Sequence, residues 1–234
     1  MLRFNGLVGP LTAIALTLFL VSSGLAAAPL SRVFHDDFEH GADRWQTTDP
    51  AEPFWKVIDS EHGKAYRVTG KSNYQPPVRS PHSIALIKDL FVGDFVFTAR
   101  VQSTNDKAGN HRDLCFFWGY QDPAHFYYVH LGRKADPHAC QIFIVNGAPR
   151  TKITVDEAPG VPWDDAWHRV KVVRRVADGT MEVYFDDIDS PLMTARDKTF
   201  TWGQVGIGTF DDHGNFDDIT VRGIKAIERR AVKP

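Results

Sequence analysis

The chain has 234 residues, with 27 basic and 29 acidic side chains and a formal net charge of −2 at pH 7. This balance argues against nucleic acid or an anionic membrane surface as a partner, because both attract an excess of Lys and Arg. The length is compatible with one domain, since β-sandwiches of about 200 residues are common as single domains.

The first residues, 1–26, are predicted to be a signal peptide. Arg3 is followed by a mainly apolar run, 11–21, and then by small residues that suit signal peptidase, with cleavage expected near Ala26 or Ala27. The apolar run is shorter than the roughly 20 residues that cross a bilayer. We therefore expect a secreted or periplasmic protein that is free of the membrane after cleavage, with an uncleaved anchor as the alternative.

The next residues, 27–224, are predicted to form one all-β domain. Runs of β-branched and aromatic residues recur roughly every 8–15 residues between turn residues, and no long stretch has a helical period. The pattern predicts a two-sheet antiparallel β-sandwich, or jelly roll. Residues 225–234 carry several charges and are expected to form a solvated tail. The clearest early strands are 33–38, 54–57, 65–68 and 94–101, and the second and third of these flank Glu61-His-Gly63 as a predicted hairpin.

Three consecutive aromatic and β-branched runs, 114–120, 125–131 and 140–145, are predicted to be antiparallel strands. Side chains two residues apart in a strand share a face. The faces predicted to point into the core carry Val129, Leu131, Ile142 and Ile144.

The opposite faces of these strands carry rings with polar tips and amide or imidazole groups, namely Tyr128, His130 and Gln141. Such a mixture suits a sugar, whose C–H faces pack on rings while its hydroxyls need hydrogen-bond partners. Together with Trp118 and Arg133, these residues predict a concave carbohydrate-binding face. The alternative is that the rings only pack beneath a loop.

A later run alternates in the same way. Trp167, Arg169 and Lys171 fall on one face, and Val170 and Val172 fall on the other. The run ends before a favoured hairpin turn, Asp-Gly, so a returning strand is expected directly after it.

Three blocks of residues carry a family resemblance. They are Trp167-His168 with Val170-Lys-Val172, then Val183-Tyr-Phe-Asp186 after Asp178-Gly179, and then Gly203 to Gly208 with Phe216-Asp217-Asp218. With Asp36-Asp-Phe38 and Tyr127-Tyr128, they resemble the concanavalin A-like lectin/glucanase superfamily in its laminin-G-like jelly-roll branch. The resemblance implies the fold and leaves the activity open, because this superfamily includes lectins, carbohydrate-binding modules, glucanases and polysaccharide lyases.

Two kinds of polysaccharide degradation are alternatives to binding alone. Glycoside hydrolysis uses two carboxylates about 5–9.5 Å apart, whereas Glu182 and Asp186 share a strand face at roughly 13 Å. β-Elimination needs a base near the C5 proton and a group that neutralises a uronate. The residues that resemble this second set, as in alginate-lyase-type jelly rolls but without their diagnostic motifs, are Tyr128, His130, Gln141 and Arg112.

The resemblance also implies a structural calcium ion, which superfamily members hold between the first and last strands. Asp217 matches the position on the last strand, and Asp37 lies in the first strand. Carboxylate and main-chain oxygens are suitable Ca²⁺ ligands. The histidines show no spacing typical of zinc ligands. Calcium is therefore the cofactor that we expect.

The two cysteines, Cys115 and Cys140, lie on the first and third of the central runs. If another strand lies between them, their sulfurs are roughly 9–10 Å apart, which is too far for a disulfide. The pattern favours free thiols, although export would permit a bond.

Overall fold

The computed structural model describes residues 1–2, 29–49 and 54–226. Nearly all of the predicted signal peptide, and residues 227–234 of the predicted tail, lie outside these ranges. Within the described ranges, no helix is long and apolar enough to cross a membrane.

Antiparallel strands dominate the described part of the chain, which confirms the predicted all-β class. In chain order the elements are β1 (Arg32–Asp36), β2 (Trp45–Thr47), β3 (Trp55–Ser60), β4 (Gly63–Thr69), β5 (Ser83–Ser103), the 3-10 helix η1 (Asp106–His111), β6 (Cys115–Asp122), β7 (His125–His130), β8 (Gln141–Asn146), β9 (Thr151–Lys152), β10 (Thr154–Asp156), β11 (His168–Arg175), β12 (Thr180–Phe185), β13 (Met193–Arg196), β14 (Gly203–Thr209) and β15 (His213–Lys225). The predicted hairpins correspond to β3–β4 and β11–β12.

Strand β5 is 21 residues long and belongs to two sheets. Up to Val92 it pairs with β2 on one side and β14 on the other, and from Val92 onward it pairs with β15 and β11. Between the two parts, Asp89 has a φ of +54°, and the register with β14 shifts there. A bulge bends a strand, so β5 leaves one sheet and enters the other.

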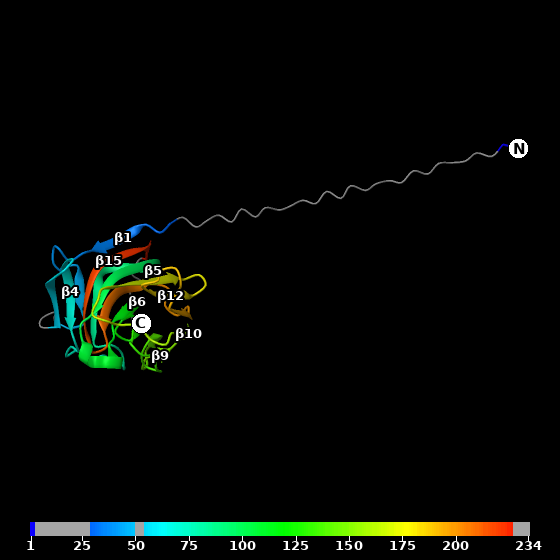
Figure 1. The fold of residues 1–234 in the computed structure, drawn as a ribbon. Helices are drawn as coiled ribbons and strands as arrows, with labels where there is room; N and C mark the ends of the chain where they lie inside the picture. The colour runs from blue at the N-terminus through cyan, green and yellow to red at the C-terminus, as the bar shows by residue number, and fades with distance from the viewer. Residues whose placement is uncertain (3–28, 50–53, 227–234) are drawn as a thin grey trace, which may run out of the picture.

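The two sheets follow from this division of β5. Sheet I runs β3–β4–β15–β5–β11–β12–β13–β10, with β1 also paired to β15. Sheet II runs β2–β5–β14–β6–β7–β8–β9. Figure 1 shows β1 lying beside β15, so the first and last described strands meet at one edge of the sandwich.

The main core lies between the two sheets. Sheet I contributes alternate residues of β5 and β11, and sheet II contributes alternate residues of β6, β7 and β8. Its members include Phe97, Val101, Val170, Val172, Phe116, Val129, Leu131 and Ile142. The predicted core face of the central strands is therefore confirmed for Val129, Leu131 and Ile142, and the half-buried Ile144 packs against the same cluster.

A second apolar cluster covers the outer face of sheet II. It contains Ile84, Leu86, Cys115, Phe117, Tyr120, Phe126, Tyr128, Phe143 and Val145, with Val78 packed against it. Arg150 places its guanidinium 4.9 Å from the ring centre of Phe143 and 4.4 Å from that of Phe210. The ring-bearing face that the sequence predicted to be open is therefore enclosed by side chains from two loops.

Glycine allows β14 to lie tightly against β5. A Cβ atom on Gly208 would stand 2.0 Å from the carbonyl oxygen of Ser83, and one on Gly206 would stand 2.3 Å from that of Ala85. The glycine-spaced sequence of β14 thus fits its place in the middle of sheet II.

Both cysteines are free, which is the state that the sequence favoured, and both are buried. Cys115 begins β6 and Cys140 precedes β8, so β7 lies between them.

Candidate functional site

The residues predicted to form a carbohydrate-binding face are only partly brought together. His130 and Gln141 are directly opposite each other on β7 and β8, and Tyr128 lies on the same face of β7. Trp118 points to the other face of sheet II, into the main core, where it stacks on Tyr127. The predicted alternation along β7 is confirmed. Both faces of β6 are apolar, so its sequence does not indicate to which face Trp118 points.

Burial separates this set from solvent. Tyr128 is 0%, Trp118 1%, Gln141 1% and His130 7% exposed, while Arg133 is exposed in the loop after β7. The Tyr128 hydroxyl accepts a hydrogen bond from Arg150 Nη1 at 2.8 Å, and burial raises the pKa of Tyr128 far above its usual value. The expected open aromatic platform is therefore absent from this face, because the second apolar cluster fills it.

A buried contact between a histidine and an aspartate lies at the end of the same cluster. His130 Nε2 is 3.4 Å from Asp113 Oδ2, and Asp113 Oδ1 accepts hydrogen bonds from Thr209 Oγ1 at 2.8 Å and from the amide of Phe210 at 3.0 Å. Burial would raise the pKa of Asp113, but His130 and these donors lower it below its usual range. His130 Nδ1 and Gln141 Oε1 are buried with no hydrogen-bond partner.

The guanidinium of Arg112 has a different set of partners from Tyr128 and His130. It donates to the side chain and carbonyl of Ser103, to the carbonyl of Asp164 at 2.8 Å and to Asp165 Oδ1 at 3.0 Å. The four residues predicted for β-elimination are thus not assembled around one point. Arg112 instead fixes the segment before β11.

The two acids considered for hydrolysis have other partners. Glu182 pairs with Arg175 at 2.6 Å and accepts a hydrogen bond from Tyr184 at 3.0 Å. Asp186 lies 2.8 Å from His168 Nδ1.

The predicted calcium ligands are close enough to affect each other. Burial raises the pKa of Asp217, and the charges of Asp218 and Asp37 raise it further, against the opposing effects of the Asp218 amide and Arg100. Among the described residues, no group of three or more His, Cys, Asp and Glu side chains is placed to hold a metal. Asp37 and Asp217 offer two carboxylates of the six to eight oxygens that Ca²⁺ takes, so main-chain oxygens and water would have to supply the rest. Calcium stays a prediction.

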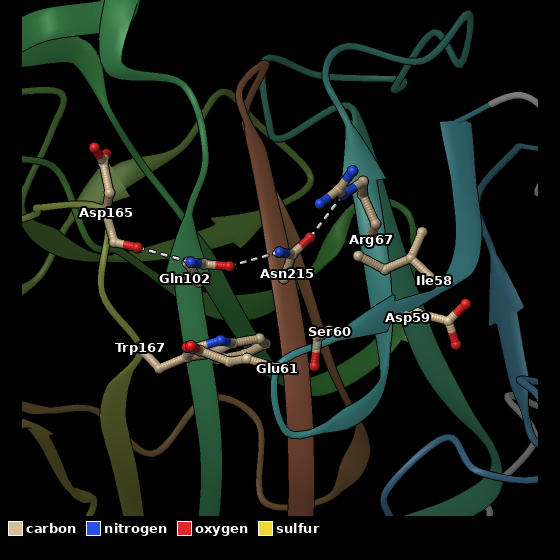
Figure 2. Close-up of a pocket in the computed structure, with 9 residues that line it drawn as sticks. All are labelled: Ile58, Asp59, Ser60, Glu61, Arg67, Gln102, Asp165, Trp167 and Asn215. Atoms are coloured by element: carbon tan, nitrogen blue, oxygen red, sulfur yellow. Dashed lines mark hydrogen bonds between the residues drawn. The ribbon is translucent and has the colours of Figure 1, made fainter.

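A different site opens on the outer face of sheet I. It is a hollow of about 330 Å³ between the β3–β4 hairpin and the segment that precedes β11 (Figure 2). Its walls carry polar and charged groups and one large ring. The lining residues are Ile58, Asp59, Ser60, Glu61, Arg67, Gln102, Asp165, Trp167 and Asn215.

A row of hydrogen bonds crosses this hollow from strand to strand. Arg67 Nε donates to Asn215 Oδ1 at 2.8 Å, Asn215 Nδ2 donates to Gln102 Oε1 at 2.7 Å, and Gln102 Nε2 donates to the carbonyl of Asp165 at 2.7 Å (Figure 2). The row runs in one direction from β4 through β15 to β5. Both amides are therefore held in a defined orientation, with one further N–H each for a ligand.

Trp167 supplies the ring. It is half-buried, with the Arg100 guanidinium 5.4 Å and the His62 ring 6.2 Å from its centre. Figure 2 shows it on one side of the hydrogen-bonded row. Trp163, four residues earlier, is buried and donates its Nε1–H to the carbonyl of Leu131 at 2.7 Å. Of these two neighbouring tryptophans, Trp163 anchors the segment and Trp167 faces the hollow.

The sequence contained part of the signal for this site. Alternation after Trp167 placed that ring on the face opposite Val170 and Val172, which the structure confirms as core. Arg67, Gln102 and Asn215 are polar residues that each directly adjoin a buried apolar residue in the sequence. Their meeting depends on β15 pairing with both β4 and β5, which no single sequence pattern reveals.

Comparison with known proteins identifies the fold. No protein-family model matches the sequence, and no curated protein matches it. Among solved structures, the carbohydrate-binding module CBM66 from Bacillus subtilis is similar, with a TM-score of 0.54, 18% identity, and coverage of 77% of this chain and 96% of that chain.

Two further structures show the same architecture. A protein of unknown function with a galectin-like fold from Bacillus subtilis has a TM-score of 0.53 and 12% identity, with coverage of 84% of this chain and 97% of that chain. The basic winged bean lectin with Tn-antigen has a TM-score of 0.52 and 12% identity, with 86% and 98% coverage. The chain thus has a concanavalin A-like jelly-roll fold, as predicted. Its place in the laminin-G-like branch stays a prediction.

Proposed function

We propose that this protein binds carbohydrate in the hollow on the outer face of sheet I. The observation that carries the proposal is the half-buried ring of Trp167 beside two amides held in a fixed orientation. A ring supports the apolar face of a sugar, and oriented amides and a guanidinium serve its hydroxyls. Similar folds in a carbohydrate-binding module and a lectin support the same conclusion.

The length of the hydrogen-bonded row indicates the size of the ligand. Arg67, Asn215 and Gln102 lie on three successive strands, with Trp167 at the start of the next. Neighbouring strands are about 4.8 Å apart, so the row spans roughly 14 Å across the sheet. An oligosaccharide segment laid across the strands fits this span. We place the protein in the secreted or periplasmic compartment on the strength of its predicted signal peptide.

The alternative function is degradation of the polysaccharide at the same hollow. Glu61 and Asp165 both line it, and glycoside hydrolases use a pair of carboxylates. Neither lies on the strand considered from sequence, which carries Glu182 and Asp186.

A polysaccharide panel tests the proposal. Wild-type protein, Trp167→Ala and Trp202→Ala are incubated with neutral and uronate-containing polysaccharides, and binding is measured by titration calorimetry. Trp202 is the matched control, because it is also half-buried but lies by the ring of Phe91, outside the hollow. Loss of binding in Trp167→Ala alone supports the site, and equal binding by all three proteins refutes it. Release of reducing ends, or absorbance of an unsaturated uronate, would establish degradation.

A further inference from the structure

The segment that shapes one wall of the hollow is fixed at both ends. Trp163 anchors its start in the core, and His168 begins β11 at its end. Between them, Asp165 and Trp167 line the hollow. Whatever fixes His168 therefore also fixes the position of the Trp167 ring.

His168 lies between two carboxylates. Its Nδ1 is 2.8 Å from Asp186 Oδ2, and its Nε2 is 3.0 Å from Asp164 Oδ1. The imidazole is 7% exposed and packs between the rings of Phe185 at 4.7 Å and Trp163 at 5.5 Å. An ionised carboxylate only accepts hydrogen bonds, so both contacts are satisfied only when both ring nitrogens carry a proton.

The other charged and polar groups around His168 hold the carboxylates in place. The amide of Ala166 donates to Asp164 Oδ1 at 2.7 Å, and this bond, followed by His168, lowers the pKa of Asp164. The amide of Arg169 donates to Asp186 Oδ1 at 2.9 Å. Arg112 donates to the carbonyl of Asp164 and pairs with Asp165. From β5, the residue paired with His168 is the uncharged Val101.

We propose that the His168 imidazolium is the positioning group of this hollow, so that Trp167 and Asp165 are held in their binding arrangement only while His168 is protonated. A neutral imidazole has one N–H, so one ring nitrogen would then face a carboxylate oxygen with two lone pairs opposed. The segment would keep its Arg112 contacts and lose one of the two His168 contacts, either with Asp186 after β12 or with Asp164. The consequence for glycan affinity, which should fall as pH rises, rests on the proposed function.

The position of this segment can be monitored without any glycan, through the solvent exposure of Trp167. The chain has six tryptophans, of which Trp45, Trp55, Trp118 and Trp163 are buried and Trp167 and Trp202 are half-buried. In a Trp202→Phe background, quenching by acrylamide, which is uncharged, reports on Trp167. The quenching constant is measured from about pH 5 to about pH 9, where imidazole groups commonly titrate.

We expect the quenching constant to rise in one step as pH increases. Loss of one hydrogen bond to a charged group corresponds to a rise of about tenfold or more in the displaced population. His168→Gln should remove the step. His62→Gln is the control, because His62 contacts the Trp167 ring directly, and it should keep the step. Asp164→Asn should also remove the step, since an amide can either accept from or donate to His168 Nε2.

A step that persists in either His168→Gln or Asp164→Asn, or that vanishes in His62→Gln, would overturn the inference. If His168→Gln does not fold, Asp164→Asn alone decides, because Asp164 is exposed. Glycan binding with a flat quenching profile would refute the coupling and leave the proposed function intact. A clear step in a protein that binds no glycan would support the coupling and refute the proposed function.

Discussion

The hydroxyl of Tyr128 and the guanidinium of Arg150 meet at 2.8 Å and close the aromatic cluster on the outer face of sheet II. Arg150 also lies over the rings of Phe143 and Phe210. The single half-buried guanidinium of Arg150 thus contacts three aromatic side chains. The contact makes this face a second core rather than an open platform.

Tyr128 should therefore behave as a core residue. Tyr128→Ala should lower the free energy of unfolding by about 3–5 kcal/mol, the usual cost of emptying a buried aromatic position. Tyr128→Phe should cost only about 1 kcal/mol, because it removes one hydrogen bond and leaves the ring. Urea unfolding of both variants checks this. An unchanged urea midpoint in Tyr128→Ala would show that the face is open, as predicted from the sequence.

Trp167 and Trp163 should respond in opposite ways to the same substitution. Trp167→Ala should weaken glycan binding by about thirtyfold, the effect of losing an aromatic hot spot, with little change in unfolding free energy. Trp163→Ala should cost about 3–5 kcal/mol of stability. Calorimetric binding and urea unfolding, applied to both variants, give the comparison. A Trp163-like loss of stability in Trp167→Ala would identify Trp167 as a structural ring.

Acid should destabilise the protein through Asp113. The pKa of this buried carboxyl lies below its usual value of 3.8. A carboxyl with a lowered pKa in the folded state stabilises the protein fully above its unfolded pKa, and that contribution is lost as pH falls through the folded value. Asp113→Asn should be less stable near neutral pH, and its stability should depend less on pH below about 4.

Urea midpoints between about pH 3 and pH 7, where carboxyl groups pass from protonated to ionised, measure this dependence. Asp189→Asn serves as the control, because Asp189 is exposed at the surface. Equal pH profiles for wild type and Asp113→Asn would remove Asp113 from the acid response.

Calcium, if bound at Asp37 and Asp217, should stabilise the folded state by mass action. The wild-type melting temperature should then fall when a chelator is added and recover with excess Ca²⁺. Asp217→Ala should abolish this response, and Asp211→Ala, which changes an exposed acid on the preceding loop, should retain it. No chelator effect on the wild type would exclude a stabilising ion.

The thiols should be inert in the folded protein. Burial raises the pKa of Cys140 to about 12 and that of Cys115 well above its usual value, and the thiolate is the reactive form. A thiol reagent at neutral pH should label neither cysteine until urea unfolds the chain. Rapid labelling without urea would contradict the burial of these residues.

Alternation along single strands could be read from the sequence. It placed Val129 and Ile142 in the core and located the β3–β4 and β11–β12 hairpins, because side-chain period and turn chemistry are local properties. It also put Trp167 on the face opposite Val170 and Val172.

Contacts between segments that are distant in the chain could not be predicted from alternation. The burial of Tyr128 depends on Val78 and Arg150 from two separate loops. The hollow depends on Asn215 lying between Arg67 and Gln102, which are 148 and 113 residues away along the chain. The order of the strands in the sheets determines which of these residues come into contact. The side-chain alternation of one strand does not indicate which strands lie beside it.

The place of β15 has a consequence for when this chain can fold. β15 is the last described strand, yet it pairs with β1 and β4 from the beginning of the domain and with β5 from its middle. During synthesis, the edge of β5 that awaits β15 stays unpaired until residues near Lys225 have left the ribosome. Long-range pairing of this kind slows folding, so the domain should reach its native state only after synthesis of β15, and a nascent chain truncated before β15 should remain sensitive to protease.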